Sequence, residues 1–111
     1  LPAYNNYTVR EKMQAVATVG DQATQLLDAY ILQHGRWPLD PSAAGIVISS
    51  ALIAGIELRP SSGQMVITTA FHPLEKQTLV FVRDDKPPSF AWRCGSKGAA
   101  EKYLHSRCRH P

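Results

Sequence analysis

Long apolar runs and the motifs of common active sites are missing from this chain. No stretch of 18 apolar residues occurs among its 111 residues, so no segment reads as a membrane-spanning helix. No basic, apolar and small-residue series of the kind that marks a signal peptide is present, and there are no repeats or low-complexity tracts. With 44% hydrophobic and 19% charged residues, the composition is that of one globular domain.

Catalytic patterns are equally scarce. The sequence has no G-x-S-x-G elbow, no Gly-rich phosphate loop and no H-E-x-x-H pair. Asp84 and Asp85 are adjacent in a predicted turn, but no oxygen-rich loop surrounds them to bind calcium. The four histidines lie in a turn, at a helix end and in the tail: His34, His72, His105 and His110. We therefore expect no catalytic residue, no metal and no cofactor.

The net charge of +3 is unevenly distributed along the chain. Residues 76–111 hold eight basic against three acidic side chains, whereas residues 1–75 hold four basic and six acidic ones. A basic end on a slightly acidic body suits an anionic partner or head-to-tail stacking of identical subunits. A solvated face that only keeps the protein soluble is an equally good interpretation of the charge alone.

Only two cysteines are present, and both lie near the C-terminus. The even count, and the Gly/Ser/Lys-containing loop between Cys94 and Cys108, favour a disulfide formed in an oxidising compartment. Two reduced core thiols are an alternative. A metal site that adds His105 and His110 to the cysteines is another, although the spacing departs from structural zinc patterns.

The first third of the chain has the pattern of one long helix, over residues 1–34. It opens without an initiator Met or a capping residue, and at 1.5 Å per residue it would reach about 50 Å. We expect it to end at Gly35, before Pro38. Apolar or small residues recur at helical spacing along one stripe: Val9, Met13, Val16, Gly20, Ala23, Leu27 and Tyr30/Ile31.

Strand patterns dominate the rest of the chain. A loop over residues 35–51 is stiffened by two prolines and carries Trp37, which we expect to pack on the domain. Its segment 42–50 fits either a short helix or an irregular cover. Apolar runs at 53–58, 65–71, 79–83 and 90–94 are separated by short turns, which predicts a four-stranded antiparallel meander within residues 52–94. A disulfide-bounded loop, residues 94–108, closes the α+β domain.

The helix stripe is longer than the predicted sheet can cover. We expect the sheet to pack on the C-terminal half of the helix, around Ala23, Leu26, Leu27, Tyr30 and Ile31. The N-terminal half then has no partner within the chain. Its apolar spacing predicts contacts with neighbouring subunits or with a preceding segment, through Tyr4, Tyr7, Val9, Met13 and Val16.

Basic residues crowd around the loop between the cysteines. Lys97, Lys102, Arg107 and Arg109 lie near Tyr103, and such groups could track a phosphate backbone while the ring stacks a base. The alternative, which we favour for the ring, is that Tyr103 and Leu104 seat the tail on the sheet.

The two ends of the chain resemble bacterial type IV pilins of the type IVa kind, without their N-terminal hydrophobic segment. The start, Leu-Pro-Ala-Tyr-Asn-Asn-Tyr-Thr-Val-Arg (residues 1–10), is similar to the stretch where the membrane-embedded half of the pilin helix becomes amphipathic. The end is similar to the closing pattern of the family, with Trp92, Cys94, Lys-Tyr-Leu (residues 102–104) and Cys108. His105 departs from the Pro that major pilins often carry there.

The resemblance implies a filament subunit that does no catalysis. It implies a homo-oligomeric filament with other pilins, help from pilus assembly machinery, and a role in adhesion, twitching motility or DNA uptake. The missing segment would anchor an inner-membrane pool, with the globular domain in the periplasm, before export into an extracellular filament. Pro2, which lacks an amide hydrogen, would loosen the complete helix.

Three alternatives stay open at this point. The chain could be a DNA-binding competence pilin that uses its basic C-terminal loop. It could be a secretion-system pseudopilin, a class that usually has a calcium site in place of the disulfide. It could also be a small secreted disulfide module with no filament role.

Overall fold

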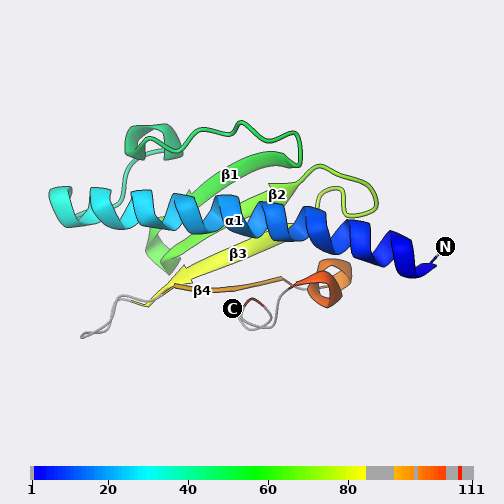
Figure 1. Cartoon of the computed structure of the whole chain (residues 1–111). Coiled ribbons are helices and arrows are strands. Elements are labelled where there is room, and N and C mark those ends of the chain that lie inside the picture. The colour runs from blue at the N-terminus through cyan, green and yellow to red at the C-terminus, as the bar shows by residue number, and fades with distance from the viewer. Residues whose placement is uncertain (1, 85–91, 97, 105–107, 109–111) are drawn as a thin grey trace.

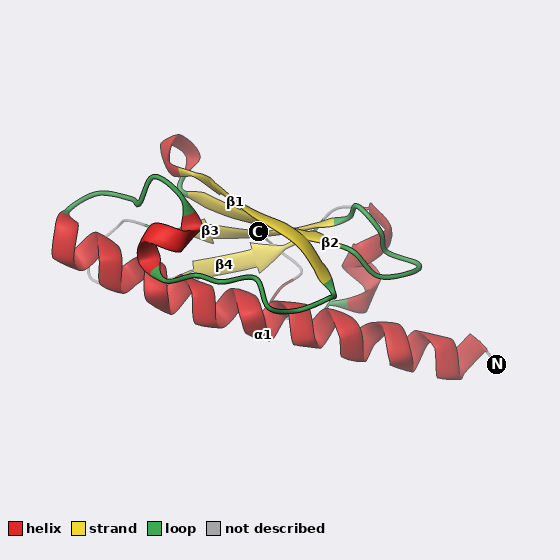
Figure 2. Cartoon of the chain, turned by 90° about the horizontal axis from the view of Figure 1, so that it is seen from above, coloured by secondary structure: helices red, strands yellow, loops and turns green. Residues whose placement is uncertain are grey.

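The computed structural model describes residues 2–84, 92–96, 98–104 and 108, with side chains from Tyr7 onward except at 98, 99 and 101. A single long helix, α1 (Pro2–His34), lies across one face of a four-stranded sheet (Figure 1). Seen from above, the N-terminal turns of α1 extend past the ends of the strands (Figure 2). The predicted long helix is confirmed, and the longest dimension of the molecule is 50 Å.

The end of α1 follows the predicted glycine cap. Gly35 has φ of 71°, in the left-handed region, and its N–H donates to the carbonyl of Ile31 at 2.8 Å. Trp37 then packs partly buried against the core, with its ring centroid 6.0 Å from that of Trp92. The predicted anchoring role of Trp37 is confirmed.

One 3-10 turn, η1 (Pro41–Ala44), interrupts the connection from the helix to the sheet. Asp40 caps it, because its carboxylate accepts from the Ala43 N–H at 3.0 Å and from the Ser42 hydroxyl at 2.6 Å. Gly45 closes the turn with φ of 81°. The segment therefore contains both a short helix and, after it, an irregular cover.

The sheet is the predicted antiparallel meander. Its strands are β1 (Ile53–Arg59), β2 (Gln64–Thr69), β3 (Thr78–Arg83) and β4 (Trp92–Gly95), in that spatial order. The short turn η2 (Pro60–Ser62) joins β1 to β2, and η3 (Gly98–Tyr103) follows β4. Both the strand order and the positions of the strands match the sequence prediction.

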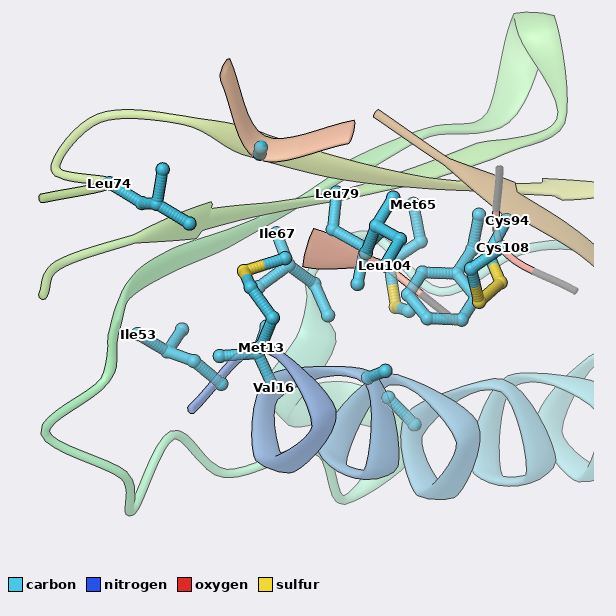
Figure 3. Packing of buried hydrophobic residues seen from close by; sticks show 14 of the residues in the cluster. Met13, Val16, Ile53, Met65, Ile67, Leu74, Leu79, Cys94, Leu104 and Cys108 are labelled. Atoms are coloured by element: carbon cyan, nitrogen blue, oxygen red, sulfur yellow. A yellow bond between two sulfur atoms is a disulfide. The ribbon is translucent and has the colours of Figure 1, made fainter. Parts of the chain in front are cut away.

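Strand register decides which side chains meet the helix. One row across the sheet pairs Leu58 with Met65, Met65 with Phe81, and Phe81 with Cys94. Met65, Phe81 and Cys94 are buried, and Figure 3 shows labelled members of this core gathered between sheet and helix. The next residue along each strand faces the opposite side of the sheet, as in the pair Val66 and Val80.

The expected division of the helix into a packed C-terminal half and an unpartnered N-terminal half is wrong. Val9, Met13 and Val16 are at most 7% exposed and belong to the same core cluster as Ile67 and Leu79. Met13 and Val16 face the sheet in Figure 3. The core also includes residues of the β2–β3 loop and of the tail, which pack outside the strands: Phe71, Leu74, Ala100 and Leu104. The loop and the tail thus supply core residues that a prediction based on the strands alone leaves out.

The C-terminal half of α1 is less covered than expected. Ala23 and Leu27 are buried as predicted, but Leu26 is exposed and Tyr30 and Ile31 are only partly buried. Leu26 lies between buried Ala23 and Leu27, so it is on the outer face of the helix. The last turns of α1, which carry Tyr30 and Ile31, run beyond the sheet at this end too (Figure 1).

Candidate interaction surfaces

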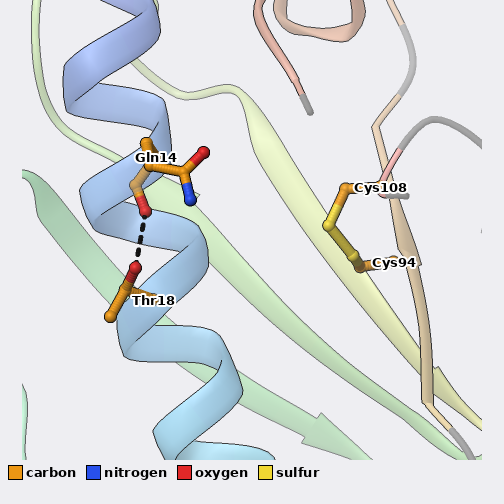
Figure 4. Close-up of a disulfide and its surroundings, with 4 residues drawn as sticks. All are labelled: Gln14, Thr18, Cys94 and Cys108. Atoms are coloured by element: carbon orange, nitrogen blue, oxygen red, sulfur yellow. Dashed lines mark hydrogen bonds between the residues drawn. A yellow bond between two sulfur atoms is a disulfide. The ribbon is translucent and has the colours of Figure 1, made fainter. Parts of the chain in front are cut away.

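The disulfide fixes the tail of the chain to an edge strand. Cys94, on β4, is bonded to Cys108 with their Cα atoms 4.4 Å apart, and both residues are buried (Figure 4). The metal interpretation of these cysteines is therefore wrong, because both sulfur atoms are used in the S–S bond. Its other two residues, His105 and His110, lie outside the described residues.

No metal or membrane site is apparent in the part of the chain that the structure describes. Among those residues, no group of three or more His, Cys, Asp or Glu side chains is placed to hold a metal ion. Within the same residues, no helix combines the length and the apolar character that crossing a bilayer requires.

Of the four basic residues predicted to form a contact surface around the disulfide loop, the structure describes one, Lys102. Lys102 is exposed, and its Nζ lies 5.1 Å from the centroid of the Tyr103 ring. Tyr103 is partly buried against the core and Leu104 is buried within it, so these two side chains seat the tail as we favoured. The other three predicted contact residues lie outside the described residues: Lys97, Arg107 and Arg109.

Of the five predicted subunit contacts, Tyr7 is placed on the surface. It is 61% exposed on α1, whereas Val9, Met13 and Val16 are buried in the core of their own chain and cannot reach a neighbour. Tyr4 lies in α1, but its side chain is outside the described part. The subunit contact predicted for Val9, Met13 and Val16 is thus wrong, for the same reason as the division of the helix.

Tyr7 and Glu11, one helical turn apart, interact on the exposed side of α1. The hydrogen bond to the Glu11 carboxylate, helped by its negative charge, raises the pKa of the Tyr7 hydroxyl. Two shallow grooves flank this pair, and both are lined by Tyr7, Glu11 and Ala15. Lys12 and Leu52 line one of them, while Arg10 lines the other. We call this region the Tyr7 grooves.

Sequence reasoning missed one polar joint between the helix and the sheet. A single oxygen of Asp28 accepts from the Arg83 Nε–H and from the Trp92 Nε1–H, each at 3.0 Å. The joint links α1 to β3 and β4, and the Trp37 ring packs edge-on against the Trp92 ring. A signal was available, because Asp28 is the sole charged residue between Gln22 and His34.

A long helix laid on a meander sheet, with a disulfide tying the tail to the last strand, defines the class of filament-forming pilin folds. A family model described as pilin, a bacterial filament, matches residues 10–109. The match includes most of the helix, the whole sheet and both cysteines. The chain belongs to the pilin family.

Curated relatives agree with this assignment. The chain is 28% identical over 118 residues to the fimbrial protein EcpC of Eikenella corrodens, covering 99% of this chain and 76% of that protein. It is 24% identical over 108 residues to a fimbrial protein of Neisseria meningitidis serogroup B, and this match covers 92% of this chain and 64% of that protein. A shorter match, 35% over 52 residues, covers 47% of this chain and 31% of the type IV major pilin protein PilE of Neisseria gonorrhoeae.

Proposed function

We propose that this chain is a structural subunit of a bacterial type IV pilus and has no catalytic activity. The observation that carries the proposal is the pilin match over residues 10–109, because it extends over helix, sheet and disulfide loop together. Relatives named as fimbrial proteins and as a type IV major pilin support the same conclusion. In this proposal Tyr4 and Tyr7 contact neighbouring subunits of a homo-oligomeric filament.

The proposed location is an extracellular filament, assembled by pilus machinery from an inner-membrane pool whose globular domain lies in the periplasm. The Cys94–Cys108 bond supports passage through an oxidising compartment such as the periplasm. The same bond favours a pilin over a secretion-system pseudopilin. A hydrophobic segment ahead of this domain would provide the membrane anchor of the subunit.

Filament isolation tests the proposal directly. Surface filaments are sheared from cells that carry the native gene, and their protein is identified by mass spectrometry and labelled by antibodies against residues 7–84. We expect this chain in the filaments, and we expect deletion of its gene to remove it from them. If the chain stays with the cells while filaments of other pilins are sheared off, the proposal is wrong.

Adhesion, twitching motility and DNA uptake are the activities we propose for such a filament. A deletion strain complemented with the native gene allows each to be measured, through attachment to surfaces, spreading of colonies and transformation by added DNA. Loss of one activity while filaments persist would assign the chain to that activity.

Direct DNA binding through the basic loop is a second candidate, supported by the exposed Lys102 beside the Tyr103 ring. A gel shift with duplex DNA across a salt series tests it, using a variant with Lys97, Lys102, Arg107 and Arg109 changed to Ala. The matched control removes the same charge elsewhere, by changing Arg10, Lys12, Arg36 and Arg59 to Ala. DNA binding through the loop would be supported if the protein retards the DNA in the gel, if this retardation weakens with salt, and if it is lost in the loop variant alone. Equal loss in both variants, or no retention at low salt, would contradict it.

A further inference from the structure

A hollow lies on the face of the sheet that points away from α1. Its floor is formed by β3, where Val80 and Val82 alternate with the buried residues Leu79 and Phe81, which face the helix. Helix α1 lies on the other side of the sheet, as Figure 2 shows. The Tyr7 grooves are on α1, so subunit contacts made there leave the hollow uncovered.

Strand register places one long polar side chain on each side of Val82. Gln64 of β2 is paired with Val82 from one side, and Arg93 of β4 is paired with it from the other. The Gln64 amide and the Arg93 guanidinium both carry N–H donors, so two donor groups border the same end of the hollow. Further along β4, Gly95 is paired with Val80. Because glycine has no side chain, it leaves space beside Val80.

Hydroxyl groups border the other end of the hollow. Thr78 lies four residues before Val82 on the same face of β3, which is about 13 Å along the strand. Thr78 is exposed, and Ser96 completes this end, with its hydroxyl donating to the Thr78 carbonyl. The hollow has a volume of about 490 Å³, within the range of about 300–1,000 Å³ that is common for ligand sites.

The charge of the hollow is positive. Among the described residues that line it, the one formal charge is that of Arg93. Glu57 on β1 faces the same side of the sheet but is ion-paired with Arg59 at 2.8 Å, and Asp84 after β3 does not line the hollow. Arg93 is exposed, and its five N–H donors allow it to contact a ligand and a neighbouring group at once. A ligand with a single negative charge therefore suits this end.

The floor and the two ends together define the chemistry of a ligand. The valine floor suits an aliphatic group, and the donor end suits a carboxylate close to that group. The C-terminal residue of a polypeptide carries both when its side chain is aliphatic, and capture of a C-terminal carboxylate is a recurring mode of peptide recognition. Its backbone amide would extend toward Thr78, whose hydroxyl can both donate and accept. A small free carboxylate lacks that amide.

We infer that the hollow binds the C-terminus of a partner polypeptide whose last residue is leucine, isoleucine or valine. Arg93 and Gln64 bind its carboxylate. Val80 and Val82 contact its side chain, and Thr78 contacts the amide that precedes it. The inference goes beyond the proposed structural role, because it gives the subunit a binding surface of its own.

An NMR titration of the purified, isotope-labelled chain tests the inference, with N-acetyl-Ala-Leu as the probe. We expect the amide signals of Val80, Val82 and Arg93 to move progressively as the peptide is added. The same peptide with an amidated C-terminus should bind about tenfold or more weakly, because it lacks the charge that Arg93 recognises. N-acetyl-Ala-Ala, which lacks the leucine side chain, and isocaproate, which lacks the peptide bond, should also bind more weakly.

Two arginine variants provide a matched comparison. Arg59 and Arg93 are both exposed and belong to one row across the outer face of the sheet, through Gln64 and Val82, but Arg59 does not line the hollow. Arg93→Gln should weaken binding of the free peptide about tenfold or more, and Arg59→Gln less than about twofold. Circular dichroism checks that each variant is folded. The comparison of carboxylate with amide uses the native chain, so it decides the question even where a variant fails to fold.

Several results would overturn the inference. They are equal binding of the amidated peptide, signal shifts confined to another part of the domain, and equal loss in the two arginine variants. Equal binding of isocaproate would assign the hollow to small carboxylates and would overturn the peptide assignment in the same way. The filament proposal stands or falls separately, on the shearing experiment.

Discussion

Gly20 of α1 lies directly against the ring of Phe81 on β3. A Cβ atom added at Gly20 would overlap the Cζ and Cε1 atoms of the Phe81 ring, far inside van der Waals contact. Phe81 is 1% exposed and is the largest of the fully buried side chains, so its ring has little room to move away. The absence of a side chain at position 20 therefore sets how closely the helix approaches the sheet.

Gly20→Ala should destabilise the domain in spite of the better helix propensity of alanine. The helix gains about 1 kcal/mol from the substitution, but overpacking against a fixed aromatic ring costs about 1–3 kcal/mol or more. Because the added Cβ would overlap the ring, the cost lies at the upper end of this range. We expect a net loss of about 2 kcal/mol in the free energy of unfolding, measured by urea denaturation. Gly55→Ala is the matched control, because a Cβ there meets nothing within 4 Å. A Gly20→Ala protein as stable as the native one would show that the ring is not fixed.

Asp28→Ala should loosen the joint between the helix and the last two strands. The Arg83 side chain is only 10% exposed, so losing its carboxylate partner leaves a poorly solvated charge. We expect a loss of about 1.5–3 kcal/mol, toward the lower end because the Asp28 side chain is 39% exposed. Glu57→Ala removes the exposed Arg59–Glu57 pair and serves as the control, with an expected loss of about 0–1 kcal/mol. Equal losses in the two variants would contradict the role of the joint.

Helical and strand periodicity predicted the elements of this fold but not all of their partners. The three-and-four spacing identified Val9, Met13 and Val16 as members of one apolar stripe, and the apolar run at 65–71 located the strand that carries buried Met65 and Ile67. The residues that cover the start of the helix could not be predicted from periodicity. Phe71 and Leu74 in a loop, and Leu104 in the tail, form that part of the core without any periodic pattern.

Surface features were harder to predict than the core. The Asp28 joint depends on residues 55 and 64 positions apart in the sequence, so only the folded arrangement brings them together. The exposure of Leu39 and Val47 also goes against their hydrophobic character, and no sequence pattern distinguishes an outward leucine in a loop from an anchored one. By contrast, once a disulfide was favoured over free thiols and a metal site, its pairing followed directly, because two cysteines allow one pairing.

The cap of η1 should respond to acid. The hydrogen bond from Ser42, with that from the Ala43 N–H, lowers the pKa of Asp40 below its usual value. A lowered folded pKa means that this contribution to stability is fully present above the unfolded pKa of about 3.9 and is lost as the pH falls through the folded pKa. NMR titration should report a pKa below that of an unstructured aspartate, and Ser42→Ala should raise it. An unchanged Asp40 pKa in Ser42→Ala would contradict the assignment.

The final prediction concerns the two ends of β4, which are held by different means. Cys94 is tied to Cys108 by the disulfide, whereas Trp92 donates a hydrogen bond to Asp28 on the helix. Replacing both cysteines by Ser removes the closed loop of about 15 residues and should cost roughly 3 kcal/mol in the free energy of unfolding.

Hydrogen exchange should then separate the two anchors. In the cysteine-free variant, amide protection should fall at Gly95 and through η3, but it should persist at Arg93, which pairs with Val82 on β3. Adding Asp28→Ala should remove protection at Arg93 as well, because the second anchor of the strand is then gone. If β4 loses protection along its whole length when the cysteines alone are replaced, the hydrogen bond to Asp28 does not hold the strand independently.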